Sequence, residues 1–156
     1  DGLLEILRRH AEQNPGDWYR APATYRRGVG EEMLQLPDPV LCVSLNGTVD
    51  PLDVRPLGYQ TSRAQLVIAY WSPSTEADIA AGEMVADLWR VLAQNRQLAI
   101  EAGSSAGIDD PDALTLLSGY LSIGPTRISA KDSPTQGEVI IEQEVTIQWT
   151  WAGTTP

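Results

Sequence analysis

The chain has 156 residues, of which 21 are acidic and 11 are basic, so its formal net charge is −10. This length suits one domain with a buried core. The acidic balance and the single lysine make the chain a poor candidate for binding nucleic acid phosphates, since such binding relies on clustered basic side chains. One cysteine and one histidine exclude an internal disulfide framework and the usual zinc sites. The sequence has neither a long apolar span nor a signal-peptide pattern, so we expect no membrane association and synthesis in the cytoplasm.

The first predicted element is a short amphipathic helix over residues 3–13. It ends at Asn14-Pro15-Gly16, a sequence that breaks helices. His10 borders the apolar face, and no acid or nucleophile motif accompanies it. We therefore expect a partly buried or capping histidine. The apolar face consists of Leu3, Leu4, Leu7 and Ala11.

Residues 15–37 have no long periodicity and alternate aromatic with arginine side chains. We predict an extended loop here. Aromatic and arginine side chains are enriched at the hot spots of protein interfaces, so the segment is either a subunit or partner interface or a loop that covers one end of the core. The candidate interface residues are Trp18, Tyr19, Arg20, Tyr25, Arg26 and Arg27.

Two strands follow. Residues 40–45 form an apolar run that ends at Asn46-Gly47, a dipeptide typical of tight turns. The only cysteine, Cys42, lies in this run, and we expect it to be a buried structural thiol. Residues 62–72 are apolar on both faces, which is typical of a strand covered on both sides.

The clearest helix follows Pro73. Thr75 and Asp78 have the spacing of a capping box. Apolar residues at helical spacing predict a buried stripe, and polar residues opposite predict a solvated face. The buried stripe is Ala77, Ala81, Met84, Val85, Leu88 and Leu92, broadened by Trp89 and Val91, and the polar stripe is Glu76, Glu83, Asp87, Arg90, Gln94 and Gln97.

The remaining chain is predicted as loops and strands. Residues 98–113 form a Gly/Ser-rich loop without the lysine of a phosphate-binding loop. Strand-like runs around 114–117 and 119–130 are interrupted by Gly124-Pro125. Residues 138–151 alternate over about twice the length of a typical strand. Their apolar face is Val139, Ile141, Val145, Ile147, Trp149 and Trp151, with Gln143 as its only polar member.

This element order predicts an α+β fold, a mainly antiparallel sheet with the long helix and the short N-terminal helix packed on it, in a single domain over residues 1–156. Glu142 and Glu144 are two apart on a strand and therefore point the same way. A general acid and base need opposed carboxylates, so we interpret this pair as an acidic surface. The sequence has no nucleophile elbow or usable Ser/His/Asp pattern, and we expect no enzyme activity, cofactor or metal.

Four segments together resemble the tail terminator proteins of tailed bacteriophages in order and character: LLEILRRHAEQNPGDWYR, PDPVLCVSLNG, SRAQLVIAYWSPSTEADIAAGEMVADLWRVL and VIIEQEVTIQWTW. The resemblance covers most of the chain. It implies a structural virion protein of the tail and neck that forms a homo-hexameric ring on the last ring of the tail tube. Such a ring stops polymerisation of the tail tube protein and joins the neck protein on the head side. In contractile phages it also meets the sheath protein.

DNA passes through such a ring without being bound specifically, and the resemblance makes Glu142 and Glu144 candidates for the acidic surface of the ring or of its DNA channel. The acidic charge agrees with that role, because an acidic wall repels phosphate. The sequence leaves two alternatives open. One is another phage neck, head-completion or baseplate protein, and the other is a small acidic binding module.

Overall fold

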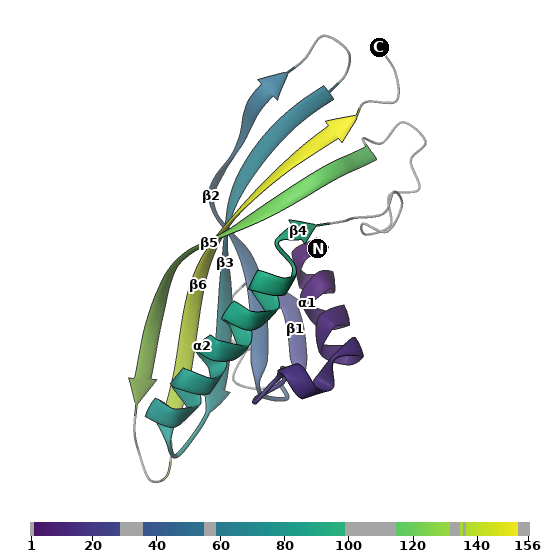
Figure 1. Ribbon diagram of the computed structural model, residues 1–156. Coiled ribbons are helices and arrows are strands. Elements are labelled where there is room, and N and C mark those ends of the chain that lie inside the picture. The colour runs from purple at the N-terminus through teal and green to yellow at the C-terminus, as the bar shows by residue number, and fades with distance from the viewer. Residues whose placement is uncertain are drawn as a thin grey trace.

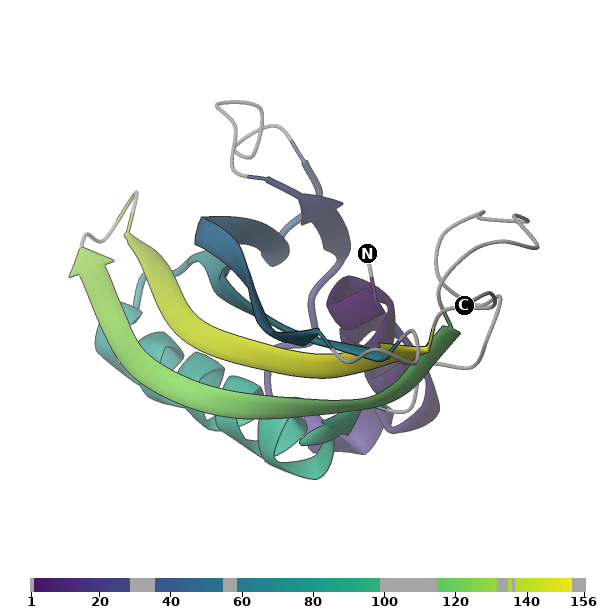
Figure 2. The same ribbon diagram turned by 90° about the horizontal axis from the view of Figure 1, so that it is seen from above.

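Six strands form one sheet, and two helices pack on the same face of it (Figures 1 and 2). The computed structural model describes residues 2–28, 36–54, 59–98, 115–131, 135 and 137–152. The elements in chain order are α1 (Gly2–Gln13), the 3-10 helix η1 (Pro15–Asp17), β1 (Thr24–Arg27), β2 (Val40–Val54), β3 (Tyr59–Pro73), α2 (Ala77–Gln94), β4 (Gln97–Leu98), β5 (Thr115–Lys131) and β6 (Glu138–Ala152).

The strand order is β1-β2-β3-β6-β5-β4. Only β1 and β2 are parallel, and every other neighbouring pair is antiparallel. The predicted α+β class, with a mainly antiparallel sheet and a long and a short helix packed on it, is confirmed. Figure 1 shows that β2, β3, β5 and β6 are strongly twisted and that their upper halves extend past both helices.

The core lies between the helices and the sheet. The predicted apolar stripe of α2 is buried at Met84, Leu88 and Leu92, and it packs against alternate residues of β3 and β6. The predicted apolar face of β6 is buried from Val139 to Val145. The side chains of Trp149 and Trp151 lie outside the described part of the structure. A second apolar cluster, on the other face of the sheet, comprises Val40, Cys42, Ala69 and Trp71, with Leu36 and Ile140 packed against it.

Two predicted interruptions of strands are wrong. Asn46-Gly47 does not end a strand, because β2 continues through it to Val54 with a register shift between Leu45 and Val49. Gly47 has a φ of 101°, a conformation that suits glycine. In the same way β5 runs through Gly124-Pro125 with a register shift. A Cβ on Gly124 would lie 3.2 Å from the Glu144 carbonyl oxygen, a tight contact that favours glycine at the bulge.

The predicted loop over residues 15–37 is wrong in part, since it contains η1 and the strand β1. The four residues of β1 are too few for a periodic pattern, and pairing with β2 defines them as a strand. Residues 29–35 lie outside the described residues, as do residues 99–113 of the second predicted loop. The capping box is also wrong. The N-cap of α2 is Glu76 without a side-chain cap, and its backbone N–H donates to Ser74 Oγ at 3.1 Å.

Candidate functional site

Asp87 of α2 holds the segment that follows η1. The backbone N–H of Tyr19 donates to Asp87 Oδ1, and the backbone N–H of Arg20 donates to Asp87 Oδ2, each at 2.9 Å. Asp87 is fully buried, although the sequence predicted it in a solvated stripe, so that prediction is wrong. Burial raises the pKa of its carboxyl, and the two backbone N–H groups and Arg90 partly offset this effect.

Two further polar side chains of α2 bind the same segment. Glu83 accepts a hydrogen bond from Arg20 Nε at 2.8 Å. Arg90 Nη1 donates to the Asp17 carbonyl oxygen at 2.6 Å, and the Arg90 guanidinium carbon lies 5.4 Å from the centre of the Tyr19 ring. Three residues of the predicted polar stripe, Glu83, Asp87 and Arg90, therefore attach residues 17–20 to the helix.

The six candidate interface residues lie in different environments. Trp18 is only 8% exposed and meets Tyr70 edge to face, with ring centres 6.4 Å apart, so it belongs to the core. Tyr25 is half-buried and packs against the same core. Tyr19, at 65% exposed, and Arg27 present side chains to solvent, whereas Arg20 and Arg26 are half-buried. The aromatic/arginine segment thus supplies both core and surface.

His10 connects three elements of the fold. Its Nε2 lies 3.0 Å from Asp17 Oδ2, and Asn95 Nδ2 lies 3.2 Å from His10 Nδ1. These contacts join the end of α1 to η1 and to the end of α2. Among the described residues, no group of three or more His, Cys, Asp or Glu side chains lies close enough together to hold a metal ion.

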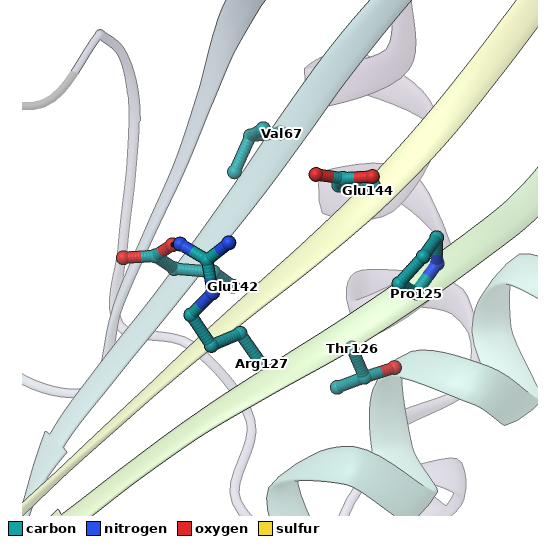
Figure 3. A pocket seen from close by; sticks show the side chains of 6 residues that line it. All are labelled: Val67, Pro125, Thr126, Arg127, Glu142 and Glu144. Atoms are coloured by element: carbon teal, nitrogen blue, oxygen red, sulfur yellow. Dashed lines mark hydrogen bonds and ion pairs between the residues drawn. The ribbon is translucent and has the colours of Figure 1, made fainter.

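Glu142 and Glu144 lie on the sheet face opposite the helices, where they border a shallow hollow (Figure 3). Arg127 Nη1 lies 3.4 Å from Glu142 Oε2 across the β5–β6 pair. The two carboxylates point to the same side, as the period of two predicted. The hollow is lined by Val67, Pro125, Thr126, Arg127, Glu142 and Glu144.

Gln143, between those two glutamates, points the other way and is fully buried. Its Oε1 accepts hydrogen bonds from Trp89 Nε1, at 2.9 Å, and from the Thr126 hydroxyl. Its Nε2 donates to the carbonyl oxygens of Gly124 and Glu144 at 2.7 and 2.9 Å. The one polar residue on an otherwise apolar strand face was the sequence signal for this site. It fixes the bulge of β5 and connects it to α2.

The phenols of Tyr25 and Tyr70 are buried, and neither has a hydrogen-bond partner within the described residues. Burial raises the pKa of Tyr25 to about 12 and raises the pKa of Tyr70 further. Because the folded state binds these protons more tightly than the unfolded chain, their contribution to stability is complete below the ordinary tyrosine pKa near 10. The contribution of Tyr25 is lost as the pH rises through about 12, and that of Tyr70 is lost at higher pH.

We therefore expect alkaline unfolding to coincide with ionisation of these phenols, measured by circular dichroism and by phenolate absorbance. The Tyr25→Phe and Tyr70→Phe double variant has no such groups to ionise, so its unfolding midpoint should move to higher pH. An unchanged midpoint would contradict this expectation.

Comparisons with models of known protein families and with curated protein sequences give no match. Among the described residues, no helix combines the length and the apolar character needed to cross a bilayer.

Proposed function

We propose that this chain is a tail terminator of a tailed bacteriophage. In this role it is a structural virion protein of the tail and neck and has no enzyme activity. Six copies form a ring on the last ring of the tail tube, stop polymerisation of the tube protein and present a surface to the neck protein. A sheath protein is a further partner if the tail is contractile.

The observation that carries this proposal is the shape of the sheet. The upper halves of β2, β3, β5 and β6 extend past both helices (Figure 1). A sheet that extends beyond the helices packed on it, and that has open edge strands, is suited to contact with other chains. Head-to-tail contacts of this kind close into a ring when the rotation between copies closes.

The open face of the sheet supports passage of DNA through such a ring. Glu142 and Glu144 bring carboxylates to that face, and one arginine, Arg127, is paired with Glu142 beside them. A net charge of −10 keeps the surface repulsive to phosphate. Glu142 faces a basic partner rather than a second carboxylate, so the pair lacks the geometry of a general acid and base.

Tail assembly in the absence of this protein tests the proposal. We expect tails of uncontrolled, greater length by electron microscopy, because nothing stops the tube. Arg26→Glu/Arg27→Glu should give the same long tails if the C-terminal end of segment 18–27 makes subunit contacts, whereas Gln65→Glu, an exposed neutral-to-acidic change, should give normal tails.

Normal-length tails without heads would contradict termination and would favour the neck or head-completion alternative. Fully normal phage made without the protein would contradict both and would favour the binding module.

A further inference from the structure

We propose that copies of this chain join edge to edge through the sheet. The outer edge of β5, over residues 122–131, pairs with the outer edge of β2, over residues 44–54, of a second copy. The inference deepens the proposed function and rests on it for the closed ring, but the pairing itself can be tested apart from any tail.

Both edges are open within the described residues. On the β5 side, β4 pairs only with Gly119 and Tyr120, and the Leu121 N–H donates to the Arg96 carbonyl at 2.8 Å. On the β2 side, β1 pairs only with Val40–Val43, and the Gly28 N–H donates to the Val43 carbonyl at 2.9 Å. Two runs of similar length therefore keep backbone groups available for another strand.

Apolar side chains lie beside both open runs. Ile128 of β5 is 53% exposed, although its cross-strand neighbour Ile141 is fully buried. Trp89 is 50% exposed and lies over β5, since its Nε1 donates to Thr126 Oγ1 at 3.1 Å. On the other edge, Leu45 of β2 is 63% exposed. A strand placed along β5 would cover Ile128 and the nearby edge of Trp89.

Charge and strand direction both favour a second copy of this chain as the partner that pairs with the open edge of β5. Residues 122–131 include Arg127 and Lys131 and no acid, whereas the sequence of residues 44–54 includes Asp50 and Asp53 and no base. Opposite net charges on the two runs favour their association. Since β2 and β5 run in opposite directions in the sheet, joining their outer edges gives an antiparallel pair, like most pairs within the chain.

The position of the two runs favours a ring over a flat ribbon. Val43, Ile68, Gln143 and Thr126 form one row across the sheet. The open run of β5 lies on both sides of this row, whereas the open run of β2 lies entirely beyond it, toward the C-terminal end of β2. Joining them displaces each copy along the strands. A sheet that closes on itself requires such a stagger, together with strand tilt.

Cysteine cross-linking tests the pairing directly. Ser129 and Asn46 are exposed, and antiparallel pairing of the two runs brings them near each other. We expect Ser129→Cys mixed with Asn46→Cys to form disulfide-linked dimers on mild oxidation, whereas each variant alone forms none. The native Cys42 is buried, so the unaltered chain is the control.

Dimers of Ser129→Cys alone would show β5 pairing with β5 and would overturn the proposal. The absence of cross-links in the mixture at about 100 micromolar protein, roughly a hundredfold above a micromolar dissociation constant, would also overturn it.

Sedimentation of two matched variants provides a second measurement. Ile128→Glu and Gln65→Glu both add a carboxylate at an exposed strand position, but only the first lies beside the proposed contact. Ile128→Glu should weaken self-association by about tenfold or more, and Gln65→Glu should leave it unchanged. Equal effects would contradict the proposal. The two proposals can fail separately. If the cysteine variants cross-link but tails made without the protein have normal length, the strand pairing is supported and the terminator function is contradicted. If those tails are too long but no cross-link forms, the terminator function is supported and the pairing is contradicted.

Discussion

Replacing Asp87 with alanine is expected to lower the free energy of unfolding by about 2–4 kcal/mol. The carboxylate accepts the backbone N–H groups of Tyr19 and Arg20, and these donors cannot be removed by any side-chain change. Removing the carboxylate relieves the cost of burying it, but it leaves two donors without an acceptor beside α2. The free-energy cost of the two unpaired N–H groups exceeds the gain from no longer burying the carboxylate. That gain is small, because two N–H hydrogen bonds already offset most of the cost of burying the charge.

Chemical denaturation measures this change, and amide hydrogen exchange locates it. In Asp87→Ala the amides of Tyr19 and Arg20 should exchange faster than in the unaltered chain. Glu83→Ala is the matched control, because Glu83 lies one turn away on α2 and makes a partly exposed ion pair with Arg20. Such a pair contributes about 0–1 kcal/mol. If the two variants lost equal stability, Asp87 would not be the residue that holds the segment.

Replacing Gln143 with leucine is expected to cost about 2–3 kcal/mol of unfolding free energy. Leucine fills a similar volume, so packing is largely kept. The loss comes from the Gly124 carbonyl, the Thr126 hydroxyl and the Trp89 N–H, which all bond to the Gln143 amide. Because these groups belong to the β5 bulge and to α2, the variant should also loosen the contact between those two elements.

The same substitution at Gln148 is the control, since that side chain is exposed on the same strand. Gln148→Leu should change stability by about 0.5 kcal/mol or less. We expect hydrogen exchange to increase around residues 123–127 in Gln143→Leu alone. Equal, small effects of the two variants would show that the buried amide bonds contribute little.

The parts of the fold that depend on periodicity could be predicted from the sequence. The apolar stripe of α2 and the alternation of β6 identify each element and its buried face, because burial imposes a period on either kind of structure. The sequence predicts breaks in the long strands β2 and β5 that the structure does not have. Asn46-Gly47 and Gly124-Pro125 are typical of turns, but pairing with β3 and β6 on both sides of each site keeps the strand continuous and turns the dipeptide into a bulge.

The contacts of the candidate site depend on distant residues. Asp87 lies on the polar side of α2, where the helical period predicts exposure to solvent. Nothing near it in the sequence indicates that a segment 67 residues away covers it. Trp18 is of a residue type that is common at interfaces, but it packs against the Tyr70 ring and therefore belongs to the core. Gln143 differs, because a polar residue on an apolar face is visible in the sequence, and only its partners were missing.

The place of β6 in the sheet has a consequence for synthesis of the chain. β6 is the last described strand in sequence, but it lies between β3 and β5 in the middle of the sheet. While the ribosome is still making residues 138–152, β3 and β5 have no strand to join them. The sheet therefore closes late, after distant segments have met, which is the kind of topology that folds slowly. Its unpaired strands are exposed until then, so the nascent chain is especially prone to aggregation until β6 is complete.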